Sequence, residues 1–210
     1  MQPSATRPGT LVLVVGPSGA GKDSLIDGAR TALERDARFV FPTRMITRRV
    51  ECDSEQHVQI SETAFEQMRK SGAFFLSWKA HGHCYGLPAD IAKHLAKGRT
   101  VVANVSRSVI EDAQAKAAHV SVVHITAPKH VVAERLRRRN RECSDEIEER
   151  LSGYDPAQPI SAVSLTIDTG DPASGDLRAR IARLVDFLDG EAANCTMPAT
   201  AQRTDSVIHR

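Results

Sequence analysis

Short apolar runs alternate with longer amphipathic segments along most of the chain. Continuous runs of apolar residues are typical of strands that are buried on both faces of a sheet. The runs that predict strands lie at residues 10–15, 39–41, 73–78, 100–105, 120–127 and 162–168. Because helical patterns separate most of these runs, the strands are expected to pair in parallel. The chain is therefore predicted to be an α/β protein with a doubly wound parallel sheet and helices on both faces.

Helical spacing of apolar residues, bounded by start and stop residues, marks the segments between the strands. Ser61 is a predicted N-cap and Gly72 a predicted stop for one helix, and Pro88 and Gly98 bound another. The predicted helices cover residues 22–34, 61–72, 88–98, 108–117, 128–142, 144–153 and 176–188. Residues 1–9 and 191–210 show no apolar period, so a single domain at 10–190 is expected between a flexible N-terminus and a flexible C-terminal tail.

Composition narrows the class of protein. Charged residues make up 26% and hydrophobic residues 41%, as in soluble globular proteins. The net charge of +2 predicts neither a nucleic-acid nor a membrane partner. No apolar run approaches the roughly 20 residues of a membrane span, and the N-terminus lacks a signal-peptide pattern. Cysteines without CxxC spacing are typical of reduced thiols. A cytoplasmic protein is expected, and a homodimer is left open.

A glycine-rich turn follows the first strand. Gly16, Gly21 and Lys22 match the pattern GxxxxGK between a buried strand and a helix. In such a loop the backbone N–H groups turn toward phosphate oxygens, the helix N-terminus adds positive charge, and the lysine bridges the β- and γ-phosphates. The predicted nucleotide-binding residues are Gly16, Pro17, Ser18, Gly19, Ala20, Gly21, Lys22, Asp23 and Ser24.

The loop departs from the usual motif at Asp23, where a hydroxyl normally ligates magnesium. A second departure is Asn104, which ends a strand where many nucleotide-binding sheets carry an aspartate. Two interpretations stay open. Asp23, with Ser24 beside it, supplies the anionic ligand for Mg²⁺ that the strand lacks. Alternatively, Asp23 only complements the positive end of its helix.

Arginines gather in two places. An exposed charge run is usually a solvated face, but beside a phosphate loop arginines can grip an acceptor phosphate and neutralise charge during phosphoryl transfer. The first group, Arg44, Arg48 and Arg49, predicts an acceptor-binding region at about 38–90. The second group, which is Arg135, Arg137, Arg138, Arg139 and Arg141, predicts an Arg-rich lid at about 137–146. The predicted catalytic residues are Lys22, Arg135, Arg139 and Arg150.

A general base is not required if the acceptor is itself a phosphate, because its oxygen is already ionised near neutral pH. The absence of an evident His/Asp pair in the sequence agrees with such an acceptor. His57 and His81 lie nearest to the expected acceptor region, and the other histidines are expected at the surface or in packing roles.

The motifs, taken together, resemble the guanylate kinase family over about residues 10–188. The resemblance rests on "GTLVLVVGPSGAGKDSL", "GAFFLSW" and "YGLP". Within that group, "GKDSL", "MITRR", "LSWKAHGHCYGLP" and "RNRECSDEIEERL" are more similar to the ribose 1,5-bisphosphate phosphokinases. The resemblance implies a P-loop kinase with a small acceptor-binding insertion and an Arg-rich lid, with ATP as phosphoryl donor and Mg²⁺ as cofactor. Asn140 departs from the glycine that is more frequent in the lid.

Departures from guanylate kinase bear on the acceptor. The segment "FLSW" reads like FLEW in that family, so Ser77 replaces a glutamate that reads guanine, and Asn104 corresponds to a guanine-reading aspartate. Unpaired guanine donors in a buried site would cost roughly 1–3 kcal/mol each. Arg48, Arg49 and Tyr85 match residues that hold the acceptor phosphate. The predicted substrate-binding residues are Arg44, Arg48, Arg49, His57, Ser77, Tyr85 and Asn104.

The resemblance implies that ATP phosphorylates the 1-phosphate of ribose 1,5-bisphosphate to give 5-phosphoribosyl 1-diphosphate (PRPP) and ADP. It places the protein in PRPP biosynthesis and phosphonate metabolism, with a small sugar phosphate as its partner. Two alternatives stay open, namely a guanylate kinase that acts on GMP and a catalytically inactive guanylate-kinase-like protein-binding module. The intact glycine loop and Lys22 favour an enzyme.

Overall fold

A five-stranded parallel sheet forms the centre of the protein. The computed structural model describes residues 7–47, 57–80, 82–139, 151, 160 and 162–196. The strands are β1 (Thr10–Val15), β2 (Phe39–Val40), β7 (Thr100–Asn104), β8 (His119–Thr126) and β9 (Val163–Asp168). Their order is β2-β7-β1-β8-β9, and every neighbouring pair is parallel. The predicted doubly wound α/β architecture is confirmed.

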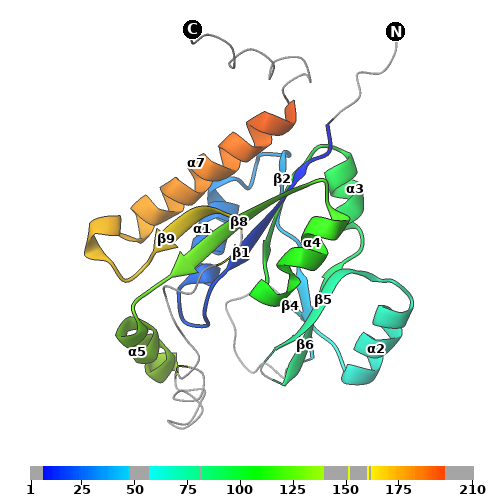
Figure 1. Cartoon of the computed structure of the whole chain (residues 1–210), viewed down its shortest axis with the longest axis horizontal. Coiled ribbons are helices and arrows are strands. Elements are labelled where there is room, and N and C mark those ends of the chain that lie inside the picture. Colours follow the sequence, from blue (N-terminus) through cyan, green and yellow to red (C-terminus); the bar gives the residue numbers. More distant parts are fainter. Residues whose placement is uncertain are drawn as a thin grey trace, which may run out of the picture.

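Alternate residues of β1 enter two different cores, since successive side chains of a strand point to opposite faces. Leu11 and Leu13 pack in a cluster with α3 (Ile91–Ala96) and α4 (Ile110–Lys116). Val12 and Val14 pack in a cluster with α1 (Lys22–Ala32) and α7 (Leu177–Thr196). Figure 1 shows these helices on the two faces of the sheet. The residues from Leu11 to Val15 are 0% exposed, which explains why this run is uniformly apolar.

A second, four-stranded sheet is built from the segment between β2 and α3. Its order is β4 (His57–Gln59), β3 (Arg44–Ile46), β6 (His83–Pro88) and β5 (Phe74–Ala80). The pair β3–β4 is parallel, and the pairs β3–β6 and β5–β6 are antiparallel. Only β5 was predicted from the sequence. The strands β3 and β4 are three residues long, and β6 follows a turn without an alternating pattern, so none of them carries a clear sequence signal.

The helix α2 (Glu62–Lys70) lies beside the second sheet and falls within the predicted helix 61–72. The side chain of Ser61 caps its N-terminus by accepting a hydrogen bond from the backbone N–H of Ala64 at 3.1 Å. Phe65 stacks on Phe74 of β5 with ring centroids 4.7 Å apart. The cap stabilises the start of the helix, and this single buried aromatic residue attaches the helix to β5 at the edge of the second sheet.

Two predicted boundaries are corrected by the structure. Pro88 does not open a helix, because it pairs with Phe74 at the end of β6, and α3 begins only at Ile91. The last helix runs to Thr196, beyond the predicted end at 188 and into the predicted tail. Ala192 and Cys195 are buried and continue its apolar face. Residues 1–6 of the predicted N-terminal tail 1–9, residues 197–210 of the predicted C-terminal tail and most of the predicted helix 144–153 lie outside the described residues.

The remaining elements follow the carboxyl ends of the parallel strands β7, β8 and β9. A 3₁₀ turn, η1 (Arg107–Val109), precedes α4, and a second one, η2 (Pro172–Ser174), follows β9. The helix α5 (Lys129–Arg139) packs through Val132, Ala133 and Leu136 in a small cluster of its own. None of the helices in the described ranges is both long and apolar enough to cross a membrane.

His124 gives the fold a testable pH dependence. It lies in β8 opposite Val15 and Thr166 and is 8% exposed. Burial lowers the pKa of His124, and the charge of Arg107 lowers it further. The unfolded chain therefore binds more protons than the folded one below about pH 6.5, so stability present above that pH is lost as the pH falls. The lowered pKa values of Asp36 and Glu66, caused by Arg38 and Arg69, act in a more acidic window.

We expect His124→Gln to reduce the acid sensitivity of the fold. The decrease in Tm between about pH 7.5 and about pH 5.5, measured by circular dichroism, should be smaller than in the wild type. His119→Gln, at the exposed start of the same strand, is the matched control and should retain the wild-type decrease. An equal decrease in all three proteins would contradict this account.

Candidate active site

The carboxyl ends of the parallel strands meet at one edge of the sheet. β1 leads into the glycine loop, β7 ends at Asn104, and β8 and β9 end at Thr126 and Asp168. β1 has β7 on one side and β8 on the other, so the connections diverge from this point. In open α/β sheets the crevice at such a switch point is where ligands bind. The structure brings the predicted nucleotide-binding loop to this crevice.

The glycine loop connects β1 to α1 in a conformation that side chains oppose. Gly16, Gly19 and Gly21 have φ angles of 148°, 84° and 92°. A Cβ atom at Gly16 would lie 2.0 Å from the carbonyl oxygen of Ile125, so the loop can pass β8 only with glycine there. Gly21 is the N-cap of α1, and no side chain among the described residues caps it. The first backbone N–H groups of α1 therefore suit a phosphate.

Lys22 folds back across the loop. Its Nζ donates hydrogen bonds to the carbonyl oxygens of Gly16 at 2.9 Å and Pro17 at 2.8 Å. The ammonium group thus lies over the backbone that would surround the phosphates, where the predicted bridging role requires it. Ser24, one residue into the helix beyond Asp23, is exposed on the first turn.

Arg135 ties α5 to the loop through Thr169. Its Nη1 donates to Thr169 Oγ1 at 2.8 Å and to the carbonyl oxygen of Gly19 at 3.4 Å, and its Nη2 donates to the carbonyl oxygen of Thr169 at 2.9 Å. Thr169 Oγ1 in turn donates to the carbonyl oxygen of Ala20 at 2.7 Å. The guanidinium group therefore lies directly beside the loop, and Nη1 would be 3.8 Å from a Cβ at Gly21. This placement agrees with the predicted role of Arg135 in charge neutralisation.

Thr169 and Arg180 were missed by sequence reasoning. Arg180 of α7 donates from Nη1 to the carbonyl oxygen of Thr169 at 2.9 Å and from Nη2 to that of Asp171 at 2.8 Å. Thr169 follows a strand without any motif, and Arg180 lies on a helix with other arginines. Thr169 contacts the loop and Arg180 contacts Thr169 because the ends of β9 and α7 meet there, so the sequence offered no signal for either contact.

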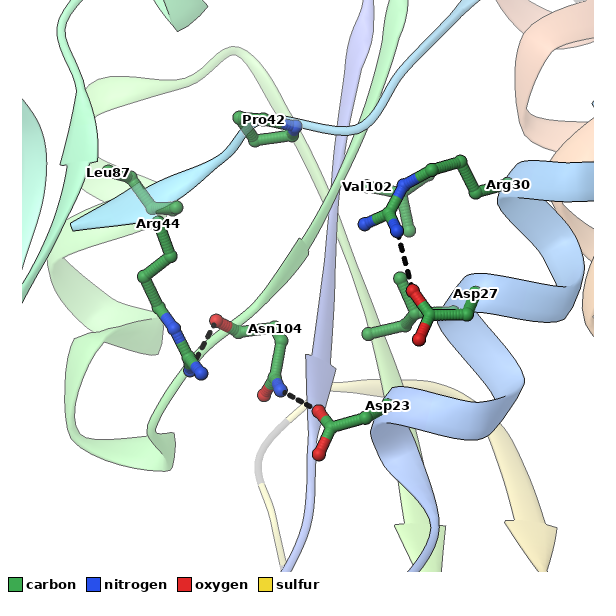
Figure 2. Close-up of a pocket in the computed structure, with 9 residues that line it drawn as sticks. Asp23, Asp27, Arg30, Pro42, Arg44, Leu87, Val102 and Asn104 are labelled. Carbon is green, nitrogen blue, oxygen red and sulfur yellow. Dashed lines mark hydrogen bonds and ion pairs between the residues drawn. The ribbon is translucent and has the colours of Figure 1, made fainter. Parts of the chain in front are cut away.

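The two departures from the usual motif contact each other. Asn104 Nδ2 donates a hydrogen bond to Asp23 Oδ1 at 2.7 Å (Figure 2). The amide thus orients the carboxylate at the start of α1 through one oxygen. Mg²⁺ favours oxygen ligands and is usually held by one or two carboxylates, with phosphates and water completing its shell. The Asp23 carboxylate and the Ser24 hydroxyl fit that requirement, although the helix-end interpretation of Asp23 stays open.

A pocket lies beside this contact, between α1, β7 and the second sheet (Figure 2). From α1 it receives four side chains, Asp23, Ile26, Asp27 and Arg30, whose spacing places them on one face of the helix. The other lining residues are Pro42, Arg44, Leu87, Val102 and Asn104. Asp27 and Arg30 were not among the predicted site residues, although their helical spacing from Asp23 was visible in the sequence.

Arg44 links the second sheet to the edge of the first. Its Nη1 donates to the carbonyl oxygen of Asn104 at 3.4 Å, and its Cζ lies 5.1 Å from the ring centroid of Tyr85. Tyr85 is 8% exposed and stacks on Trp78 at 5.4 Å. The register places His57 opposite Arg44, and Ser77 opposite the residue after Tyr85. The structure thus gathers these predicted acceptor residues in the second sheet, and Arg44 among them contacts Asn104.

Other predicted residues cannot be placed. Arg48, Arg49, His81 and Arg150 lie outside the described residues, as does most of the predicted lid. Arg139 is the last residue of α5, and its side chain is not described. The roles of these residues stay predictions.

The family model named guanylate kinase matches residues 8–159. A ribose 1,5-bisphosphate phosphokinase PhnN from Rhodopseudomonas palustris is 46% identical over 165 residues, which cover 79% of this chain and 83% of that protein. A protein of the same name from Methylobacterium radiotolerans is 48% identical over 145 residues, covering 69% and 82% of the two chains.

A longer relative is the bifunctional ribose 1,5-bisphosphokinase-thymidine phosphorylase of Roseobacter denitrificans, which is 42% identical over 178 residues. The match covers 82% of this chain, but the chain spans only 26% of that protein. The crystal structure of guanylate kinase from Anaplasma phagocytophilum shares the fold, with a TM-score of 0.60 and 18% identity over 90% of this chain and 89% of that one. The chain therefore belongs to the guanylate kinase family and, within it, to the ribose 1,5-bisphosphate phosphokinases.

Proposed function

We propose that the protein transfers the γ-phosphoryl group of ATP to the 1-phosphate of ribose 1,5-bisphosphate, giving 5-phosphoribosyl 1-diphosphate and ADP. The observation that carries this proposal is the contact between Asn104 and Asp23. The amide of Asn104 donates to Asp23, whereas a guanine-reading site would use a carboxylate there to accept from the base. Arg44 points its guanidinium group to the same edge, which favours a phosphate over a purine.

In this reaction an ionised oxygen of the acceptor 1-phosphate attacks the γ-phosphorus, and the bond from that phosphorus to the β–γ bridging oxygen breaks. ADP leaves with the electron pair, so no proton has to be removed from the acceptor. The loop N–H groups and Lys22 hold the donor phosphates. Arg135 lies beside the loop and offsets the charge that spreads over the transferred group. The sequence predicts the same task for Arg139, in the predicted lid, and for Arg150, which follows the lid.

The acceptor would be held between α1 and the second sheet. Arg44 lines the pocket there and contacts Tyr85, and the family resemblance assigns Arg48 and Arg49 to the acceptor phosphate. Asp23, with Ser24, would hold Mg²⁺, which supplies charge neutralisation on the donor phosphates. The names of the relatives are consistent with a role in PRPP biosynthesis and phosphonate metabolism. We place the protein in the cytoplasm.

The acceptor preference tests the proposal directly. With ATP and Mg²⁺, kcat/KM for ribose 1,5-bisphosphate should exceed that for GMP by at least about 100-fold, because guanine donors would lose acceptors at two positions. ADP release in a coupled assay gives the rates, and phosphorus NMR identifies the diphosphate product. GMP as the better acceptor would overturn the proposal. Absence of ATP binding in calorimetry would favour the protein-binding module instead.

Moving the carboxylate from Asp23 to position 104 tests the magnesium role. Asp23→Ser restores the usual hydroxyl but should raise the Mg²⁺ concentration for half-maximal activity by about tenfold, since one anionic ligand is lost. Asp23→Ser combined with Asn104→Asp should recover most of this loss. Asn104→Asp alone should lower Tm, because two carboxylates would then lie within contact distance. If Asp23→Ser leaves the Mg²⁺ dependence unchanged, Asp23 serves only the helix end.

Thr169→Val tests the connection between Arg135 and the loop. The substitution removes the hydroxyl that accepts from Arg135 and donates to Ala20. A hydrogen bond to a charged group contributes about 1.5–3 kcal/mol, so the KM for ATP should rise about tenfold or more. Thr166→Val, at an exposed position of β9, the strand that Thr169 follows, is the control and should leave this KM unchanged. Equal effects of the two substitutions would refute the connection.

A further inference from the structure

Arg30 is a second cation of the pocket, and neither the motif nor the proposed transfer step has given it a task. Its Nη1 pairs with Asp27 Oδ1 at 2.5 Å, one helical turn earlier. Its Cζ lies 5.5 Å from the ring centroid of Phe41. Its Nε is buried and has no hydrogen-bond partner within the described part of the chain. Arginine carries five N–H donors. Nε is buried and one donor of Nη1 is paired, so within the described part of the chain the two donors of Nη2 and one of Nη1 stay available to an anion.

The position of Arg30 along α1 places it away from the transfer step. Arg30 is eight residues beyond Lys22, or about 12 Å along the axis at 1.5 Å per residue. Helical side chains lean toward the N-terminus, so the guanidinium group lies nearer to the loop than its Cα does. Figure 2 shows Arg30 entering the pocket from α1 and Arg44 entering it from β3. The transferred phosphoryl group belongs at the end of the pocket beside the glycine loop, and Arg30 lies at the opposite end.

The surroundings hold the guanidinium group ready for a ligand. Phe41 lies against the charged group, which orients it without using its donors. The ion pair with Asp27 fixes Nη1 of Arg30, and it also offsets the negative charge of Asp27. The side chains of Arg30 and Asp27 are 28% and 38% exposed, so an anion can reach the remaining donors from the pocket. A planar fork with free donors in a partly buried site favours a phosphate group.

We propose that Arg30 binds the non-reacting phosphate of the acceptor and thereby makes the enzyme prefer a sugar with two phosphates over one with a single phosphate. This inference rests on the proposed function, because it presupposes a bisphosphate acceptor. Asp27 is a positioning residue that keeps the fork of Arg30 directed into the pocket. The two phosphates of the acceptor are then held by different parts of the site, the reacting one near the loop and the other on α1.

The test compares two acceptors that share the reacting group, ribose 1,5-bisphosphate and ribose 1-phosphate. In the wild type, kcat/KM should favour the bisphosphate strongly. Arg30→Gln keeps much of the side-chain stem but removes the charge, and it should raise the KM for the bisphosphate by about 30-fold or more. Its kinetics with ribose 1-phosphate and its KM for ATP should stay within about twofold of the wild type, because those ligands do not reach Arg30. Calorimetry with the bisphosphate alone should show the same loss of affinity.

Two further variants separate this role from a structural one. Arg69→Gln removes an arginine with the same i, i+3 pairing, to Glu66, on the exposed face of α2. It should leave the preference unchanged. Arg30→Lys keeps a positive charge without the planar fork, so its preference for the bisphosphate over ribose 1-phosphate should be intermediate. If Arg30→Gln fails to fold, Arg30→Lys is used for the same comparison of the two acceptors.

An equal effect of Arg30→Gln on both acceptors, or no effect on either, would refute the role of Arg30 while wild-type turnover still supports the proposed function. A wild type that ignores ribose 1,5-bisphosphate would refute both.

Discussion

The complete burial of β1 is the constraint on which the rest of the molecule depends. A central strand of a parallel sheet has helices on both faces, so the residues from Leu11 to Val15 must all be apolar and carry no chemistry themselves. The chemistry is attached to the end of the strand instead. Gly16 leaves the sheet so close to Ile125 that the backbone of the loop is positioned by β8, and the loop then delivers Lys22 and the start of α1 to the crevice.

The charges around this loop are arranged by hydrogen bonds between elements that are far apart in the chain. Thr169 joins Arg135 to the loop backbone, and Asn104 joins β7 to Asp23. Such contacts are stronger in a partly buried site than in water, and they hold the groups in place before a substrate arrives. The donor side of the site is thus positioned by β9 and α5, and the acceptor side by β7 and the second sheet.

α1 connects the two sides. Its first turn faces the loop, and its next two turns carry Asp27 and Arg30 into the pocket that Arg44 enters from β3. One rigid helix therefore sets the spacing between the glycine loop and the end of the pocket at Arg30. A helix is well suited to this task, because its rise per residue is fixed and its side chains on one face keep their order. In the role proposed for Arg30, the helix fixes how far from the loop this residue would bind the second phosphate.

The sequence by itself determined the parallel sheet, the order of its helices and the phosphate loop, because buried strands, helix caps and the glycine pattern are local signals. It did not reveal β3, β4 and β6, whose short runs form strands only against each other, or the helical continuation to Thr196, which Ala192 and Cys195 stabilise by burial. The pairing of Asp23 with Asn104, the pairing of Arg135 with Thr169 and the presence of Arg30 in the same pocket as Arg44 were decided by the tertiary structure alone. Each joins or encloses segments that are distant in the chain, and a contact of that kind leaves no periodicity in the sequence.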